Sequence, residues 1–458
     1  MSDIAGVVST KPGTGLMRSM AVGNRGTFHL FLAVVGFSIA VRLCVLFAVR
    51  HIPFSSDAQD YQFVAQQLVS GHSFVPYWPP GLPLYLAPFV AAGASDVILR
   101  ASMLVFWLLA CWGLYRLMES LELSGVAWLV LLVFSLLPDS IQLSIEPLTQ
   151  LPTAALLLVG LSSAVKVFRG ASVYEFVLMG LSLGATSLVR PSAGVLLVVL
   201  PVACALYTRR VVPAFGSVIL GFVLIGSWMV HSHAMTGRWV FNTANAYNMY
   251  YGNNPWTPNY RTWFFGSHAK IGTTEIDRFP EYKKTLEHVL SLPALERPEA
   301  FRQLTAAAVH GHFGLFLFRT CNRTRCFFGF DTFSGAGLSG RTWRGIGLSR
   351  VVLLLEAFVY LLIMVPSVFW IAQAAGEFWK DAANQLILAT ILLYAVPYWL
   401  SMSHPTYHFP ILLPIAILGA NAWRVAGGDR IRVRAWMAVA VLMAVQVEWV
   451  WRMAGAAV

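Results

Sequence analysis

Two carboxylates stand close together in a chain that has few of them. Asp57 and Asp60 lie three residues apart in the stretch SSDAQDYQFVAQQLVSG (55–71), and the 458 residues include only 21 acidic side chains. Side chains three apart on a helix are neighbours, so one of this pair could act as a general base on a reacting hydroxyl while the other binds substrate. The same acids could instead stabilise a helix, because carboxylates in a first turn complement its dipole. The local sequence leaves both interpretations open.

The residues around the two acids predict a short amphipathic helix over 57–70. Ser56 and Gln59 match a capping box in which Ser56 is the N-cap, and Gly71 suits the left-handed position that follows a helix. The apolar positions recur at helical spacing: Ala58, Tyr61, Val64, Ala65, Leu68 and Val69. We therefore expect a surface helix that presents the acids in its first turn.

The composition indicates that this helix lies beside a membrane. The chain is 57% hydrophobic and 12% charged, and its mean hydropathy is +0.65, whereas a soluble domain has about 25% charged residues. Apolar runs long enough to cross a bilayer as helices recur along the sequence. They predict an all-α polytopic membrane protein with about eleven spans: 28–49, 97–118, 124–144, 147–168, 172–190, 191–208, 211–233, 349–373, 383–402, 409–424 and 433–451.

The basic residues of the short loops predict the orientation. Cytoplasmic loops are enriched in Lys and Arg, and a cytoplasmic N-terminus places most of these residues inside: Arg116, Lys166, Arg169, Arg209, Arg210, Lys380, Arg424, Arg430, Arg432 and Arg434. Arg100 and Arg452 are the exceptions. The first apolar run is too long for a cleaved signal peptide and is interpreted as an uncleaved signal anchor.

This orientation divides the chain into four regions. Residues 1–27 form a cytoplasmic tail, and 28–233 form an N-terminal transmembrane region that includes a first external loop at 50–96. Residues 234–348 are an external insert, and 349–458 contain the C-terminal transmembrane helices. The polar groups thus gather on one side of the membrane.

The net charge of +11 does not indicate a nucleic-acid partner. Most arginines lie at the ends of predicted helices, and no basic region has a DNA- or RNA-binding pattern. Cys and His residues show no metal-ligand spacing, so we predict no metal site from them, although a divalent cation held by the acids is left open.

Five motifs, taken in order, resemble those of a known class of membrane enzymes. They are Asp57 with Tyr61 and AQQLVSG (65–71), then YWPPGLP (77–83), SIEPLTQL (144–151), LVRPSAGVLLVVLP (188–201) and HPTYHFPILLP (404–414). The ordered set is similar to the GT-C glycosyltransferases. These include protein O-mannosyltransferases and the bacterial transferases that attach aminoarabinose or galacturonic acid to lipid A.

The resemblance implies an activity and a location. The donor would be a sugar on a polyprenyl phosphate within the lipid bilayer, and the acceptor a hydroxyl of an envelope glycolipid, polysaccharide or protein. Transfer would invert the configuration at the anomeric carbon of the sugar. It would take place at the periplasmic or external face of a bacterial inner membrane. Asp57 aligns with the catalytic acid and Glu146 with the second acid, which orients the base, binds sugar or helps to hold a metal. Asp60 and Tyr61 would contact substrate.

Two departures from the family pattern shift the expected phosphate site. Ala58 follows the first acid where many relatives have Glu, and YWPPGLP lacks the lysine that the lipid A transferases use for phosphate. An arginine is then the expected partner of the donor phosphate. Arg190 is the main candidate, since a charge at the edge of a span is costly without a partner, although it could simply snorkel to the headgroups. Arg341 and Arg344, in the arginine-rich end of the insert, are further candidates.

Two other polar groups are candidate substrate contacts. Asn253 and Asn254 lie in NAYNMYYGNNPW (245–256), whose amides and aromatic rings suit a sugar, and Tyr407 and His408 lie in the turn before a late span. Ordinary turn and interface roles remain open for both groups.

Two other functions stay open as well. One is a flippase or transporter of a lipid-linked substrate, which would need charges near the middle of the membrane. The other is a GT-C-type glycan polymerase or ligase that depends on the arginines of the insert.

Overall fold

The protein is described by a computed structural model that covers residues 25–343, 345–374, 376–427 and 430–454. These residues are almost wholly helical, and their only strands, β1 (Thr342–Trp343) and β2 (Ile346–Gly347), form a small antiparallel hairpin. The predicted all-α class is confirmed. Of the predicted tail, residues 1–24 lie outside the described residues.

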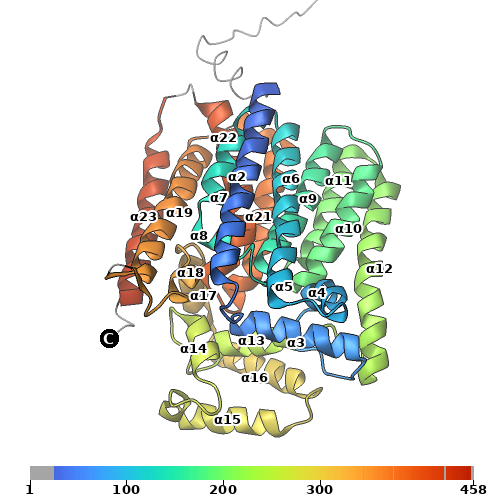
Figure 1. Ribbon diagram of the computed structural model, residues 1–458, viewed down its shortest axis with the longest axis vertical. Coiled ribbons are helices and arrows are strands. Elements are labelled where there is room, and N and C mark those ends of the chain that lie inside the picture. Colours follow the sequence, from blue (N-terminus) through green and yellow to red (C-terminus); the bar gives the residue numbers. More distant parts are fainter. Residues whose placement is uncertain (1–24, 344, 375, 428–429, 455–458) are drawn as a thin grey trace, which may run out of the picture.

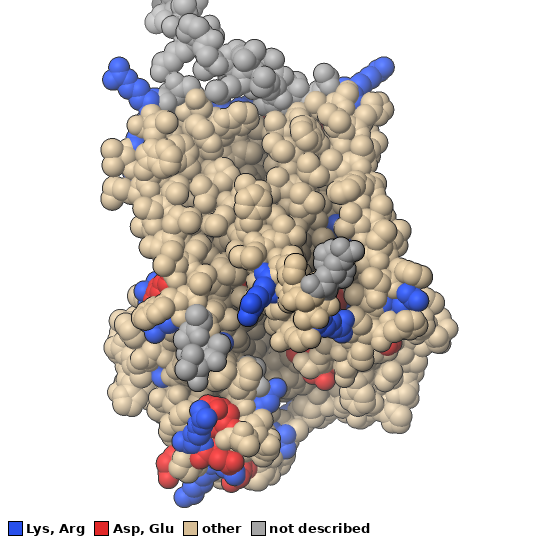
Figure 2. Space-filling view, turned by 60° about the vertical axis from the view of Figure 1, so that its left-hand side comes forward, with Lys and Arg blue, Asp and Glu red and all other residues tan. Residues whose placement is uncertain are grey.

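Nine helices among the described residues are long and apolar enough to cross a membrane. They lie side by side along the long axis of the molecule (Figure 1). Figure 2 shows a broad band on one face that is nearly free of charged side chains. The nine are α2 (Arg25–Val49), α5–α6 (Asp96–Ser102 and Leu104–Ser120), α9 (Gln150–Phe168), η2–α11 (Pro191–Ala193 and Gly194–Thr208), α12 (Val211–Thr236), α19 (Leu348–Gln373), α21 (Ala382–Leu400), η4–α22 (Pro405–His408 and Phe409–Ala426) and α23 (Val433–Ala454). The chain therefore has the architecture of a multi-pass membrane protein.

Two of the eleven predicted spans differ from a full-length helix. The prediction of one helix over 124–144 is wrong, because the chain forms η1 (Ser124–Val126), α7 (Ala127–Ser135) and α8 (Pro138–Gln142). The break falls at Leu137, whose extended backbone (ψ 120°) is what a residue before proline prefers. The run at 172–190 forms α10 (Tyr174–Val189), which has 16 residues. Neither segment is by itself long enough to count as a span.

The short helix α10 is nevertheless packed tightly within the bundle. A Cβ atom on Gly180 would lie 2.4 Å from the Ser217 carbonyl of α12, and one on Gly184 would lie 2.7 Å from the Cα of Gly221. Glycine lets the two backbones approach this closely, as in other membrane helix pairs.

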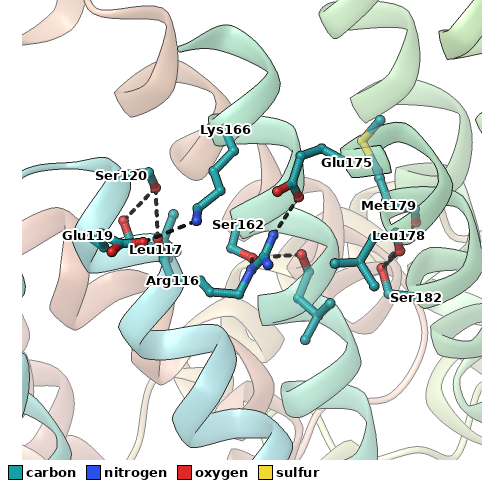
Figure 3. Close-up of polar contacts among 11 residues, drawn as sticks. Arg116, Leu117, Glu119, Ser120, Ser162, Lys166, Glu175, Leu178, Met179 and Ser182 are labelled. Carbon is teal, nitrogen blue, oxygen red and sulfur yellow. Dashed lines mark hydrogen bonds and ion pairs between the residues drawn. The ribbon is translucent and has the colours of Figure 1, made fainter. Parts of the chain in front are cut away.

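Ion pairs join α6, α9 and α10 at one end of the bundle (Figure 3). Arg116 donates to Glu175 at 2.5 Å and to the Ser162 hydroxyl at 3.4 Å, and Lys166 pairs with Glu119 at 3.1 Å. These are two of the basic residues that we assign to the cytoplasmic side.

The first loop and the insert gather at the other end of the bundle (Figure 1). The first loop forms α3 (Ser56–Ser70) and α4 (Gly81–Ala91). The insert forms α13 (Ala244–Asn253), α14 (Thr262–His268), η3 (Ile276–Arg278), α15 (Pro280–Ser291), α16 (Arg297–Gly311), α17 (Phe313–Phe327) and α18 (Phe333–Ala336). A short helix, α20 (Glu377–Lys380), precedes α21. The insert has an aromatic core that includes Tyr247, Tyr250, Phe265, Tyr282 and Phe301.

Buried arginines of α17 fasten the insert to the membrane helices. Arg323 donates to the Trp399 carbonyl of α21 at 2.5 Å and to the Gly252 carbonyl of α13 at 2.9 Å. Gly252 itself lies so close to α21 that a Cβ atom there would be 1.7 Å from the Ser401 carbonyl oxygen. The insert is thus held against the bundle by backbone contacts.

We expect Gly252→Ala to weaken this junction. The added methyl must displace backbone, and such overpacking costs about 1–3 kcal/mol of stability. The thermal unfolding temperature of the detergent-solubilised protein should fall. Gly216→Ala in α12 is the matched control, since nothing lies within 4 Å of its added Cβ. Equal unfolding temperatures for the two variants would contradict the close approach.

Candidate functional site

The helix that carries Asp57 ends where predicted and begins one residue earlier. It runs from Ser56 to Ser70, and Gly71 ends it in the left-handed region (φ 69°), as predicted. The predicted capping box is wrong, because Ser55 is the N-cap and its side chain makes no capping hydrogen bond. The Gln59 amide instead donates to the Phe54 carbonyl at 2.8 Å.

Glu146 accepts a hydrogen bond from the N-cap residue of this helix. Its Oε1 accepts a hydrogen bond from the backbone N–H of Ser55 at 2.5 Å, and its Oε2 accepts one from the Gln142 amide at 3.4 Å. A carboxylate at a helix N-terminus satisfies a free N–H and complements the dipole. Glu146 is 6% exposed and both of its oxygens are engaged. The structure therefore gives it a contact that positions α3, and its predicted catalytic role stays a prediction.

Arg100 fixes the same junction from the other side. It donates to the Ile52 carbonyl at 2.8 Å and to the Ile145 carbonyl at 3.3 Å, and its guanidinium lies 4.4 Å from the ring centre of Phe54. It thus ties the segment before α3 to the segment that carries Glu146. This contact accounts for one of the two arginines that do not fit the orientation rule.

The surroundings of Asp57 raise the pKa of its carboxyl group. Its side chain is exposed, yet burial is the main cause that raises its pKa above the ordinary value, followed by the negative charge of Asp60. The positive charges of Lys270 and Arg190 lower the pKa of Asp57, and the negative charge of Glu146 raises it. Burial disfavours the charged form of a carboxyl group, and a neighbouring negative charge does the same. Asp57 is therefore a carboxylate whose pKa is shifted toward that of a useful base.

Arg190 lies where α10 ends and the chain turns at Pro191. Its Nε donates to the Thr149 hydroxyl and its Nη1 to the Tyr398 hydroxyl, both at 3.0 Å, and the guanidinium is 5.3 Å from the ring centre of Tyr407. No carboxylate in the described part of the chain forms an ion pair with it. Two neutral hydroxyls orient this arginine without neutralising it, so its charge is available to an anion.

Aromatic side chains surround the acid and the arginine. The Tyr61 ring lies 5.2 Å from that of Trp78, whose indole N–H donates to Asp60 at 3.3 Å, and Tyr407 stacks on Tyr398 at 4.9 Å. Burial and the charge of Asp57 raise the pKa of Tyr61, so its hydroxyl stays a neutral donor. Asp60, Tyr61 and Tyr407 therefore lie near the residues that we predicted to act on substrate.

Lys270 is the residue of this site that the sequence did not reveal. It follows α14 in the insert, and its exposed ammonium group is among the charges that lower the pKa of Asp57. Lys270 is more than 180 residues away in sequence from YWPPGLP, the stretch that lacks a lysine. No local pattern around Lys270 marks it, because only the fold of the insert places it there.

Other predicted residues have different surroundings. The Asn253 amide donates to the Met249 and Leu400 carbonyls, and the fully buried Asn254 accepts from two backbone N–H groups of its own turn. His408 is buried, with Nδ1 2.6 Å from the Phe327 carbonyl oxygen. These contacts indicate structural roles, and substrate binding by the three residues stays a prediction.

The insert arginines also differ from one another. Arg341 is exposed on the loop that carries β1, and Arg344 lies outside the described residues. Arg319 donates to the carbonyls of Asn254, Pro255 and Thr257, which holds the GNNP turn. Arg190 is a predicted phosphate-binding arginine whose charge acts on Asp57.

The described residues contain no preformed metal site. No group of three or more His, Cys, Asp or Glu side chains there is arranged to hold one. Glu146, the third carboxylate of the area, already accepts two hydrogen bonds, so we derive no metal-dependent step.

We expect Glu146→Ala to loosen the start of α3, since an unsatisfied backbone N–H costs about 1–3 kcal/mol when buried. Amide hydrogen exchange in residues 54–60 should accelerate. Glu146→Gln keeps an acceptor oxygen and should show a smaller effect. Unchanged exchange in the alanine variant would mean that Glu146 does not hold α3.

Comparison with known proteins gives this chain no family. No protein-family model and no curated protein matches it. Its function must therefore be inferred from the residues around Asp57 and Arg190.

Proposed function

We propose that this chain is an inverting glycosyltransferase of GT-C type that moves a sugar from a polyprenyl-phosphate donor to a hydroxyl acceptor. The observation that carries the proposal is the carboxylate of Asp57, whose pKa is raised and on which the positive charges of Arg190 and Lys270 act. A base beside two cations suits a reaction in which a hydroxyl loses a proton while a phosphate leaves. The ordered sequence motifs support the same class.

The chemistry assigns one role to each side chain. Asp57 accepts the proton of the acceptor hydroxyl as its oxygen attacks the anomeric carbon from the side opposite the phosphate. The bond from that carbon to the phosphate oxygen breaks, and the lipid phosphate leaves with the electron pair. Arg190 and Lys270 stabilise the charge that develops on this oxygen. One displacement inverts the anomeric centre.

The position of the site suits a lipid-linked donor. Arg190 lies at the junction of α10 and η2, and its partner Tyr398 lies near the end of α21. At this level a polyprenyl chain remains in hydrocarbon while the sugar meets water. We infer that this end faces the periplasm or exterior of a bacterial inner membrane and that the N-terminus is cytoplasmic. The count of eleven spans requires that α7–α8 and α10 be included.

The transporter alternative would draw support from charges inside the spans. Arg42 of α2 is such a charge, but it bonds to the Ser38 carbonyl at 3.1 Å and to the Ser140 hydroxyl at 2.9 Å, and it stacks on Trp107 at 3.4 Å. Glu356 of α19 accepts the Asp139 backbone N–H at 3.0 Å. Both are held by fixed partners within the protein and favour no transport path.

The polymerase or ligase alternative depends on arginines of the insert. Arg319 and Arg323 are buried and donate to backbone carbonyls, which favours a structural role for both. No specific contact supports this alternative over a reaction at Asp57.

We expect Asp57→Asn to reduce sugar transfer by about 100-fold or more, as the loss of a general base does. Membranes containing each variant would receive a panel of polyprenyl-phosphate sugars and an envelope extract, and products would be followed by mass spectrometry. Asp277→Asn is the control, because Asp277 lies exposed in the insert and pairs with Lys283. Full activity of Asp57→Asn would exclude it as the base.

The charges around Asp57 predict opposite shifts in the pH profile. Asp60 raises the pKa of Asp57 and Lys270 lowers it. Asp60→Asn should therefore move the acid limb of kcat/KM to lower pH, since the base stays ionised in more acidic solution. Lys270→Gln should move the limb to higher pH and also raise the KM for the donor. Identical acid limbs in all three proteins would contradict Asp57 as the titrating group.

A further inference from the structure

A hollow lies between the insert and the end of the last membrane helix. Its volume is about 460 Å³, within the usual range of small-molecule sites. The side chains that matter are Tyr260 and Arg261 from the segment before α14, Phe318 and Asn322 from α17, and Trp451 and Arg452 from α23. None of them belongs to the site around Asp57.

Positive charge is in excess around this hollow. Glu448 pairs with Arg325 at 3.0 Å and is 3.8 Å from Arg452, whereas Arg261 pairs with no carboxylate in the described ranges. Two guanidinium groups thus share one carboxylate, and the third has none. The guanidinium groups of Arg452 and Arg325 lie 5.1 and 5.7 Å from the ring centre of Tyr260. This arrangement attracts an anion.

Several buried polar atoms there lack a partner. Tyr260 is 5% exposed, and its hydroxyl has no hydrogen bond to any described residue. The Nε atoms of Arg261 and Arg325 are also buried without a partner. Buried polar groups are nearly always bonded, so unpaired donors beside a cavity point to a ligand that accepts hydrogen bonds.

The hollow lies at the end of a helix that is apolar enough to span a membrane. Trp451 and Arg452 are near the end of α23, a helix that is apolar enough to span a membrane, and Trp and Arg commonly anchor such ends at the headgroups. Trp451 is 67% exposed and Phe318 is 53% exposed. On the face that Figure 2 brings forward, charged side chains gather at this end, below the uncharged band. A ligand here would meet guanidinium groups on one side and exposed rings on the other.

We propose that this hollow binds the phosphate headgroup of an anionic phospholipid from the surrounding leaflet. Arg261, Arg452 and the Tyr260 hydroxyl hold the phosphate, and the acyl chains run along Phe318 and Trp451. The site is separate from the one that we propose for the sugar donor, and it does not depend on that function.

Binding of short-chain lipids tests the proposal. The full chain in neutral detergent would be titrated with dihexanoyl phosphatidylglycerol, with dihexanoyl phosphatidylcholine and with inorganic phosphate, and followed by calorimetry. We expect the phosphatidylglycerol to bind at least about 10-fold more tightly than either other probe. The double variant Arg261→Gln/Arg452→Gln should lose about 10-fold or more of that affinity, which corresponds to about 1.4 kcal/mol.

Control variants separate the site from general charge and from folding. Arg278→Gln/Arg302→Gln makes the same charge change at exposed positions of the insert and should bind as the wild type does. Tyr260→Phe removes only the unpaired hydroxyl and should weaken binding several-fold even if the double variant fails to fold. Asp57→Asn should bind phosphatidylglycerol normally, which distinguishes this site from the proposed active site.

Three results would overturn the proposal. The first is equal affinity for the two lipids, and the second is unchanged binding in both Tyr260→Phe and the arginine variant. The third is binding of inorganic phosphate as tightly as phosphatidylglycerol, since the hollow would then take a free anion rather than a lipid.

Discussion

A charged side chain in apolar surroundings needs partners from within the chain, and this constraint organises the molecule. Arg100, Arg319 and Arg323 each donate to two or more backbone carbonyls. These bonds join segments that are far apart in the sequence, so each arginine also fixes a loop. Arg190 differs because two hydroxyls orient it and no carboxylate among the described residues pairs with it. The arginines that build the fold can thus be told apart from Arg190, whose two hydrogen-bond partners carry no charge.

The same constraint keeps Asp57 in place. Glu146 accepts the N–H of Ser55, the N-cap residue of α3, and Arg100 holds the segment before it. Precise placement of a general base depends on such supporting contacts. Glu146 therefore matters to the proposed chemistry through its contact with the start of α3, because this contact helps to set where Asp57 lies.

The sequence predicts those features that depend on short-range patterns. Apolar runs predict the membrane helices, and Gly71 marks the end of α3, because hydropathy and left-handed backbone are local properties. The prediction of a capping box was wrong, and a distant carboxylate, that of Glu146, bonds to the N-cap residue instead. The prediction of one helix over 124–144 was wrong because hydropathy contains no information on the backbone conformation that Pro138 imposes on Leu137.

Long-range contacts account for the features that the sequence did not predict. Arg100 looked like an exception to the orientation rule, although its real partners are carbonyls 45 and 48 residues away. Lys270 had no motif around it at all. The contacts of both residues depend on how segments remote in sequence lie in the fold. A single sequence gives no direct information on those positions.

The insert contributes basic groups to both sites through one short helix. Arg261 immediately precedes α14 and Lys270 follows shortly after its end. Between them Phe265 is buried, with its ring centre 4.6 Å from that of Tyr282 and 5.1 Å from that of Phe279. The aromatic core of the insert therefore helps to fix Arg261 beside the hollow at the end of α23 and Lys270 after the other end of α14. One packed helix thus places two cations at separate positions, and each of the two proposed sites depends on the same core.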